Sequence, residues 1–516
     1  MSEGNNVGGL VGAAAAVGAI VGIAMVVRKM SASPEKEAPP PAFEVEVEKE
    51  DIIRCPHATK DGQRWTLSEV DEMTSVTWIR FAVRIESLLD ADTLRTALER
   101  VLAEFPFVAS RLDTTSDPLR YGLKLDDQSA NGVIFETARG IRREANAKLP
   151  DVDSPSSAWS AAGIFFAPEG ARPSPEETLL MTRLVRFEDE GVSYISVQLN
   201  HCLGDAQTYV LLMQKWSEAC SSSAAPESLR PAELPPRVTK PVGETPSTRS
   251  ALLAKWRNEI GGSPPLATRW YWFKLIANFI WASKTCETVE VCIDRKGLDT
   301  LKANVKKELP GDEWVSSYEL AMSAVLCAQS AAKSGSRAKD TRPVVQSFNV
   351  RGKLARYPEN YFGNAVFDVP LQVEMDPNSL SSSALSLHRA IRAELDKDGE
   401  NLACRKNWLE HSRVLGMREE TGVFHIVGDC VAGKQTFTNT WSGYNWLVDM
   451  GAPAGKGASA YMVPPPVSAP GLNIIMPRAP NGDQAIYVVL PKSKVAAFWD
   501  YVASAKLPFR KPHDET

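Results

Sequence analysis

The stretch Leu179–Trp216 constrains the fold of this chain most, because it predicts two strands, a tight turn and a helix in direct succession. From Ile195 onward apolar and polar residues alternate, which is typical of a strand and places His201 on the apolar side at the strand's end. Gly204 ends the strand, and Asp205 is a favourable N-cap for the apolar-periodic segment that follows. An inward-facing histidine where a strand turns into a helix is well placed to act as a general base.

The spacing His-x-x-x-Asp is weak evidence by itself, because it occurs three times in this sequence. We interpret His57, in a polar stretch, as a solvated loop residue, and His425, in an apolar stretch, as a structural histidine of a strand. For His201 two readings stay open on these grounds: a general base, or a core histidine satisfied by its own turn.

Length and composition limit the class of protein. A chain of 516 residues is too long for one ordinary core, so two domains are expected. A net charge of -5 without a dense basic stretch argues against nucleic-acid binding. The eight cysteines contain no Cys-x-x-Cys pair, which argues against a zinc site or disulfide framework, so we expect no metal and a reducing compartment.

The N-terminal segment predicts a membrane anchor. Residues 7–27 carry no charge and would span about 31 Å as a helix, which is enough to cross a bilayer core. Glu3 precedes the segment while Arg28 and Lys29 follow it, so the rest of the chain should face the cytosol. We therefore expect a single-pass protein of the endoplasmic reticulum or another organelle membrane, anchored by residues 1–30. A cleaved targeting segment is the alternative.

The remaining chain divides by composition. Residues 31–51 are rich in Pro and Glu and predict an extended tether. We assign residues 52–220 to a first domain, 221–284 to a crossover with a Ser/Pro-rich start, and 285–516 to a second domain. Within these we expect an amphipathic helix in 92–112, a strand at 287–293 and a helix at 316–333.

Several segments together resemble a known family. In chain order they are WTLSEVDE (65–72), AEFPFVASRL (103–112), the His201 segment, VSSYELAMSAVLCA (315–328), FNVRGKLARYPENYFGNAVF (348–367) and TNTWSGYNWLVDMGAPAG (438–455). They are similar to the ordered motifs of the BAHD-type acyl-CoA-dependent acyltransferases, or HxxxD acyltransferases. Collinearity of many weak motifs favours this resemblance over any single match.

The resemblance implies an α/β fold with two chloramphenicol-acetyltransferase-like domains of mixed sheets. A long crossover joins them, and an active-site channel runs between them. Acyl-CoA would enter from one side, as co-substrate rather than bound cofactor, and a small hydroxylated acceptor from the other. A monomer is expected.

The resemblance also implies roles for residues of the site. His201 would be the general base, and the indole N–H of Trp441 would hold the acyl carbonyl or oxyanion, although Trp441 as a core residue remains an alternative. Asn439 and Thr440 stand where acceptor contacts are expected.

Three further residues are expected to be structural at the site. Asp205 would hold the turn by capping the helix or pairing with an arginine, Arg351 would pair with Asp205 or contact CoA, and Asp449 would lie away from the chemistry. The sequence departs from the family pattern at Ala206, which replaces a glycine, and at Ala452, which replaces a tryptophan. These departures indicate a divergent member.

Two functions from different classes follow. The first is a membrane-tethered O-acyltransferase, for which the anchor indicates a lipophilic acceptor. The second is a non-catalytic relative that acts as a partner in lipid or fatty-acid metabolism. A peptide-forming condensation domain is disfavoured, because Asn200 replaces the second histidine that such domains carry.

Overall fold

The computed structural model describes residues 42–512 with internal gaps, the longer of which are 167–172, 238–244, 260–273, 396–409, 416–428, 453–458 and 463–470. The expected anchor at 7–27 and the histidine at 425 lie outside the described residues. Within the described part of the chain, no helix combines the length and the apolar character needed to cross a membrane.

The folded part begins earlier than the sequence indicated. Strand β1 (Phe43–Ile53) pairs antiparallel with β6 (Val133–Arg142), so the expectation of an extended tether up to residue 51 is wrong for residues 43–51. β1 is an edge strand whose middle residues are exposed, and its acidic side chains reach arginines of its neighbour, as in the 2.8 Å pair of Glu46 with Arg139. Charged side chains suit an exposed sheet edge, and here they concealed a strand pattern.

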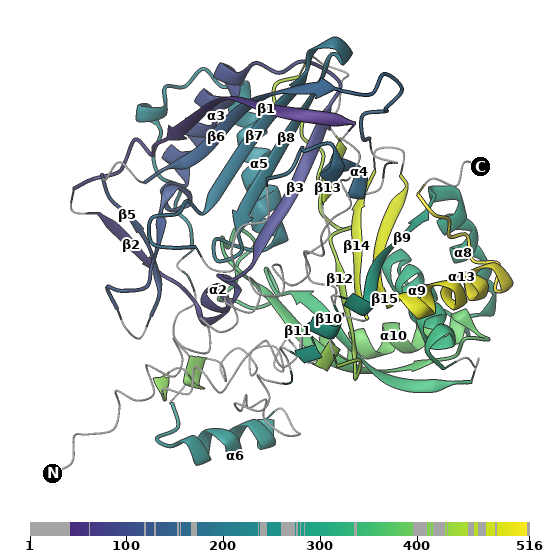
Figure 1. The fold of residues 1–516 in the computed structure, drawn as a ribbon. Coiled ribbons are helices and arrows are strands. Elements are labelled where there is room, and N and C mark those ends of the chain that lie inside the picture. The colour runs from purple at the N-terminus through teal and green to yellow at the C-terminus, as the bar shows by residue number, and fades with distance from the viewer. Residues whose placement is uncertain are drawn as a thin grey trace.

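The first lobe is built on a six-stranded sheet in the order β1-β6-β7-β8-β3-β13 (Figure 1). Only the β6–β7 pair is parallel. Its other strands are β7 (Leu180–Phe187), β8 (Val192–Asn200), β3 (Trp78–Ile85) and β13 (Ser459–Met462). Its helices are α3 (Ala91–Glu104), α4 (Ser156–Ala161) and α5 (Ala206–Cys220).

Strand β8, which precedes the candidate histidine, is buried along its whole length. On one side Phe81 of the neighbouring strand meets Tyr209 of α5, with ring centroids 3.7 Å apart. On the other side Tyr194 of β8 meets Trp159 of α4 at 5.4 Å. Helical layers therefore cover both faces of the strand, and its polar side chains are buried with its apolar ones.

A small three-stranded sheet, β2 (Gln63–Thr66), β5 (Gly122–Leu125) and β4 (Arg111–Asp113), lies at the edge of the first lobe. It leads into α2 (Glu69–Thr74), where Ser68 and Asp71 form a reciprocal capping box. The short 3-10 turns are η1 (Pro106–Ala109), η2 (Glu188–Glu190), η3 (Pro226–Ser228) and η4 (Lys492–Lys494).

The second lobe is built on a six-stranded mixed sheet in the order β11-β10-β12-β14-β15-β9. The strands are β9 (Cys286–Ile293), β10 (Asp340–Asn349), β11 (Val366–Met375), β12 (Thr436–Thr440), β14 (Leu472–Arg478) and β15 (Gln484–Pro491). The helices are α8 (Arg295–Glu308), α9 (Ser317–Ser334), α10 (Leu380–Leu395) and α13 (Val495–Ser504). Figure 1 shows these helices gathered on one side of the sheet.

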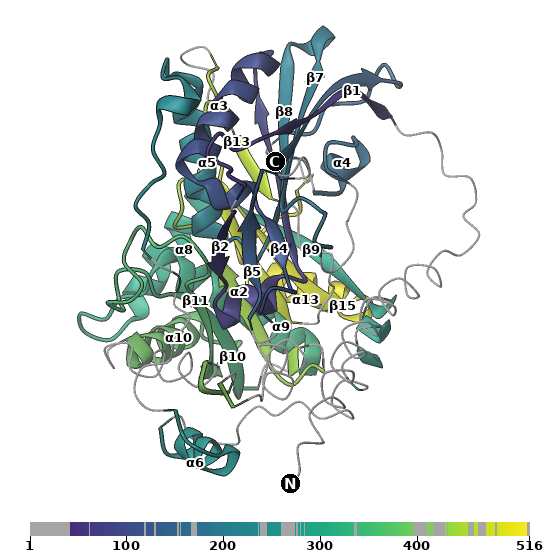
Figure 2. The same ribbon diagram turned by 90° about the vertical axis from the view of Figure 1, so that its left-hand side faces the viewer.

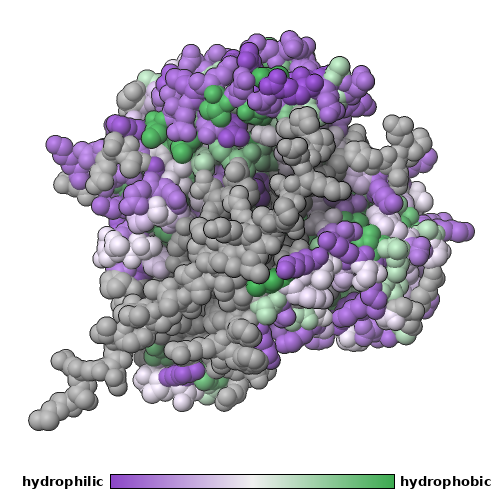
Figure 3. Space-filling model, in the orientation of Figure 1, coloured by the Kyte–Doolittle hydropathy of each residue, from purple (hydrophilic) through white to green (hydrophobic). Residues whose placement is uncertain are grey.

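The crossover between the lobes contains helix α6 (Arg249–Glu259), which lies at the rim of the molecule in both ribbon views (Figure 2). The face shown in Figure 3 is largely hydrophilic over the described residues of both lobes, with scattered hydrophobic side chains.

The lobes are not separate along the chain. Strand β13 comes from the second half of the sequence but pairs antiparallel with β3 of the first sheet. A boundary that gives all of 285–516 to the second domain is therefore wrong for residues 459–462. The first lobe's core also includes Ile474 of β14 and Tyr487 of β15, so one face of the second sheet is directed toward the first lobe.

Candidate active site

The turn after β8 is shaped by Asn200, the last residue of the strand. Its amide Nδ2 donates to the carbonyl of Ser75 at 3.0 Å, and its Oδ1 accepts from the backbone N–H of Cys202 at 3.0 Å. The backbone N–H of His201 donates to the carbonyl of Thr77 at 2.8 Å. These bonds end the strand and fix the backbone of the histidine.

The His201 side chain is half-buried, and its Nδ1 is buried without a hydrogen-bond partner among the described residues. Burial lowers the pKa of His201, because desolvation disfavours the imidazolium. The ring is therefore neutral at neutral pH. A neutral imidazole with an available nitrogen can accept a proton.

Asp205 holds the other end of the turn. It caps α5 by accepting from the N–H of Thr208 at 3.2 Å, and its side chain is almost fully buried. Arg351 meets both carboxylate oxygens, with Nη1–Oδ2 at 2.8 Å and Nη2–Oδ1 at 3.0 Å. The N–H of Ala365 donates to Oδ2 at 2.9 Å. Of the two partners expected for Arg351, the structure contains Asp205.

This ion pair joins the lobes, because Asp205 begins a helix of the first lobe while Arg351 and Ala365 follow strands and turns of the second. The guanidinium also donates from Nε to the carbonyl of Tyr361 at 2.9 Å, so it holds the segment after β10 in place. A buried bidentate pair of this kind fixes geometry, and breaking one partner leaves an uncompensated charge.

A second buried ion pair supports the backbone immediately after His201, and the sequence analysis did not find it. Arg237 of the crossover lies 2.7 Å from Asp71 Oδ2. The same guanidinium donates to the carbonyls of Cys202 at 3.1 Å and Leu203 at 3.0 Å. Burial by itself raises the pKa of Asp71, but the charge of Arg237 and hydrogen bonds from Asn364 and Ser68 outweigh it and lower the pKa overall.

Asn364 of the second lobe is also a support that sequence reasoning missed. Its Nδ2 donates to the carbonyl of His201 at 2.8 Å and to Asp71 Oδ1 at 2.9 Å, and the hydroxyl of Thr74 reaches the same His201 carbonyl at 3.1 Å. The motifs around Asp71 and Asn364 were visible in the sequence, but their contact spans 293 residues and only folding brings them together.

The structure places Trp441, Asn439 and Thr440 at the end of β12, on the second lobe. Trp441 is half-buried beside the first-lobe core, its ring centroid 6.4 Å from that of Trp446. Its backbone N–H donates to Ile475 at 2.9 Å, and no described residue accepts a hydrogen bond from its indole N–H. The indole is therefore free to donate elsewhere. Asn439 Oδ1 accepts from the N–H of Thr440 at 2.8 Å, and the hydroxyl of Thr440 is hydrogen-bonded to that of Ser442 at 2.8 Å.

The segment after Trp441 lies against α5. The ring of Trp446 contacts Phe81 and Tyr209 at centroid distances of 5.4 Å and 6.0 Å, and the hydroxyl of Tyr444 accepts from Asn349 at 3.3 Å. At the far end of α5, Ser217 donates to Asp449 Oδ1 at 2.9 Å. Asp449 thus lies at the opposite end of the helix from His201.

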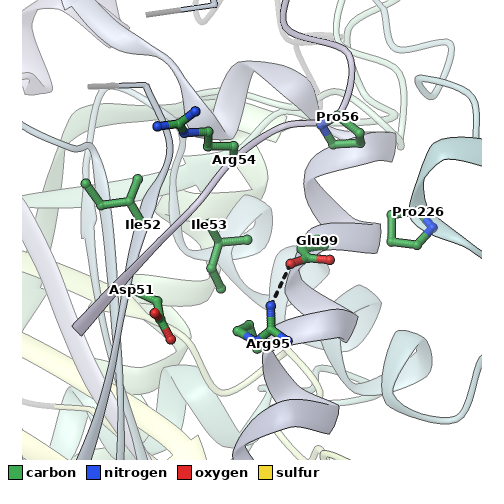
Figure 4. A pocket seen from close by; sticks show the side chains of 8 residues that line it. All are labelled: Asp51, Ile52, Ile53, Arg54, Pro56, Arg95, Glu99 and Pro226. Atoms are coloured by element: carbon green, nitrogen blue, oxygen red, sulfur yellow. Dashed lines mark hydrogen bonds and ion pairs between the residues drawn. The ribbon is translucent and has the colours of Figure 1, made fainter. Parts of the chain in front are cut away.

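No cluster of three or more metal-ligating side chains occurs in the part of the chain that the structure describes. A surface pocket of about 360 Å³ opens between the end of β1 and α3, lined by residues that include Arg54, Arg95 and Glu99 (Figure 4). Arg95 and Glu99 pair within it at 3.1 Å. None of the candidate site residues lines this pocket.

Comparisons with known proteins agree with this architecture. Residues 43–255 match the model of the Transferase family. No curated protein sequence matches the chain.

Solved structures are similar over most of the chain. F. sporotrichioides TRI101 complexed with coenzyme A and T-2 has a TM-score of 0.61 at 15% identity, covering 87% of this chain and 99% of its own. F. graminearum TRI101 complexed with ethyl coenzyme A has 0.59 at 14%, covering 86% and 97%. Vinorine synthase has 0.56 at 16%, covering 90% and 98%. The fold is the one seen in TRI101 and vinorine synthase, so the expected α/β fold with two mixed-sheet domains is confirmed.

Proposed function

We propose that this protein is a BAHD-type acyltransferase that moves an acyl group from acyl-CoA to a hydroxyl of a small acceptor, with His201 as general base. The observation that carries the proposal is the neutral, half-buried imidazole of His201, whose turn is held by both lobes. The transferase match and the coenzyme A in the TRI101 structures support acyl-CoA as the donor.

The chemistry needs two steps. Nε2 of His201 takes the proton of the acceptor hydroxyl as its oxygen attacks the thioester carbonyl carbon. The tetrahedral intermediate then collapses, the carbon–sulfur bond breaks, and the imidazolium gives its proton to the CoA thiolate. The acyl group passes directly to the acceptor, so no covalent acyl-enzyme forms.

The intermediate carries an oxyanion, for which a preorganised donor is the main source of stabilisation. We assign this role to the indole N–H of Trp441, which has no protein partner among the described residues. Asp205 takes no part in proton transfer, because Arg351, Thr208 and Ala365 already occupy its oxygens. Cys202 is fully buried and is not the nucleophile.

The location and the character of the acceptor form the remaining part of the proposal. An uncharged segment at 7–27, followed by Arg28 and Lys29, supports a single-pass anchor with the catalytic lobes facing the cytosol. A catalytic part tethered at a bilayer surface favours an acceptor with a substantial apolar portion.

The test is a CoA-release screen with the purified full chain, using short, long and aromatic acyl-CoAs and a lipid extract as the acceptor pool. We expect acceptor-dependent release of free CoA by the wild type and none by His201→Ala. The matched control is His57→Ala, which removes the histidine of another His-x-x-x-Asp sequence, where His57 Nε2 lies 3.0 Å from a carbonyl of the crossover.

Two results would contradict the proposal. Failure of the wild type to release CoA under any of these conditions would favour a non-catalytic partner protein. Equal release by wild type and His201→Ala would move the chemistry to another residue.

A further inference from the structure

The second sheet has two unlike faces where β10, β11 and β12 lie side by side. One face packs on the second-lobe helices through residues such as Val344, Phe348 and Val369. The opposite face is directed toward the first lobe, since Ile474 on that face belongs to the first-lobe core.

Three polar residues form a row on the face that is directed toward the first lobe. Ser347 of β10 lies directly opposite Asp368 of β11 in the antiparallel ladder. On its other side, the parallel register that pairs Gln346 with Thr438 brings Ser347 next to Asn439, which in turn pairs with Ile474. Neighbouring strands are about 4.8 Å apart, so the row from Asp368 to Asn439 spans roughly 10 Å.

The row has unused hydrogen-bonding capacity. The hydroxyl of Ser347 donates to Asp368 Oδ1 at 2.7 Å, and no described residue pairs with Oδ2 of this carboxylate. Asn439 Oδ1 accepts from the N–H of Thr440 at 2.8 Å, while its Nδ2 has no partner among the residues that the structure describes. All three side chains are half-buried.

The Asp368 carboxylate is costly to bury with one neutral donor. Burial raises the pKa of Asp368 to about 6, and the hydrogen bond from Ser347 lowers it by less. A donor supplied by a bound molecule would complete the hydrogen bonding that the protein leaves open.

The row shares strand β10 with Asn349, a residue that contacts helix α5. Asn349 is two residues further along β10 than Ser347 and on the same face, about 7 Å away. Its Nδ2 donates to Oε1 of Gln207, which belongs to the first turn of α5, and to the hydroxyl of Tyr444. The same turn of α5 is capped by Asp205, four residues after His201. Strand β10 therefore carries both the row and a residue that contacts the helix beginning after the His201 turn.

We propose that Asp368, Ser347 and Asn439 form a subsite that binds a second hydrogen-bond-donating group of the acceptor, a hydroxyl or an ammonium, away from the hydroxyl that is acylated. The inference rests on the proposed function for the identity of the reacting group. It makes the acceptor bifunctional: one hydroxyl meets His201 and a second polar group meets Asp368, with an apolar portion between.

Calorimetric titration of the full chain with three probes tests the subsite: 1-octanol, 1,8-octanediol and 8-amino-1-octanol. The wild type should bind the diol, the amino alcohol or both about tenfold more tightly than 1-octanol, as expected for a hydrogen bond to a charged group. In Asp368→Asn and Asp368→Ala that preference should fall to about twofold or less. Either variant alone tests the subsite, so the test still stands if the other fails to fold.

The matched control is Asp340→Asn, at the exposed start of β10, which should keep the wild-type preference. The two polar probes separate the candidate groups, because a preference for the amine alone identifies an ammonium and a preference for the diol a hydroxyl. Wild-type protein that does not distinguish the three probes, or Asp368 variants that keep the preference, would overturn the inference.

The outcome is separable from that of the proposed function. CoA release in the transfer assay without any probe preference would leave the acyltransferase standing and remove the subsite. A probe preference that persists in His201→Ala, together with no CoA release by the wild type, would leave the subsite standing and remove the transferase.

Discussion

The side chains at the two ends of the turn from His201 to Asp205 differ in how many hydrogen bonds the protein makes to them. The ring of His201 is half-buried, and its Nδ1 has no partner among the described residues, while the backbone carbonyl of His201 accepts from Asn364. The carboxylate of Asp205 is almost fully buried and receives bonds from Arg351, Thr208 and Ala365.

The difference indicates that the two residues of this short motif have separate roles, one chemical and one structural. The histidine end leaves a side chain available for proton transfer, while the aspartate end is used completely in joining the lobes. The backbone between them is supported separately by Arg237, which donates to the carbonyls of Cys202 and Leu203. Substitutions of His201, Asp205 and Arg237 should therefore have distinguishable effects on activity and stability.

The largest effect on activity is expected at His201. His201→Ala should reduce acceptor-dependent CoA release by about 10³-fold or more, because the general base is lost. Its free energy of unfolding should change by less than about 1 kcal/mol, since the ring makes no side-chain hydrogen bond through Nδ1. CoA release and urea unfolding measured on the same preparation check both parts. A large loss of stability would show that the ring is structural.

At Asp205 the main effect is expected on stability rather than on catalysis. Asp205→Ala leaves the Arg351 guanidinium buried without its partner and should destabilise the fold by about 3–5 kcal/mol. In a double-mutant cycle on urea unfolding, Asp205→Ala combined with Arg351→Met should cost clearly less than the sum of the two single changes. Additive losses would mean that the two side chains are not coupled. Normal stability of Asp205→Ala with no activity would instead indicate a direct chemical role.

The support between the two ends should give an intermediate effect. Arg237→Met removes the donors to the carbonyls after His201 and leaves Asp71 buried without its cation. We expect kcat to fall by about 10- to 100-fold while the KM for acyl-CoA changes little, because a small displacement of the base is felt in the transition state. Arg237→Lys, which keeps the charge, should recover part of the loss. A change confined to KM would place Arg237 in substrate binding.

The smallest effect is expected in the pH dependence of activity, which follows the protonation of His201. Desolvation lowers the pKa of His201 below its ordinary 6.5, so the base is deprotonated at pH 7 and the acid limb of kcat/KM lies below pH 6.5. The same shift contributes stability above pH 6.5 that is lost as the pH falls, because the unfolded state takes up the proton first. A pH–rate profile with its acid limb above 6.5 would contradict the environment seen here.

Local sequence signals were sufficient for the turn itself. The alternation before His201 and the cap at Asp205 act over a few residues, and both are present in the structure. The supports were not predictable in the same way, because Arg237 lies in a segment whose composition indicates a linker, and Asp71 meets Asn364 only after folding. The pairing of Arg351 with Asp205 likewise became visible only in the three-dimensional arrangement.

Two strands of the first sheet, β1 and β13, were not predicted because their sequences lack the usual strand pattern. β1 was concealed because its exposed edge carries a run of glutamates, which composition alone assigns to an extended segment. β13 is only four residues long, and its partner β3 lies more than 370 residues earlier, so no local pattern marks it as part of the first sheet. Both cases arise from the sheet edge, where pairing is set by the neighbouring strand.

The origin of β13 has a consequence for synthesis of the chain on the ribosome. The hydrogen-bonding edge of β3 stays open until residues 459–462 have emerged, more than 370 residues after β3 itself. An open edge beside β8, a strand that is buried along its whole length in the folded protein, is a template for pairing with another nascent chain. Recombinant yield should therefore depend on translation speed and chaperone supply, and a shortened product ending before residue 459 should aggregate.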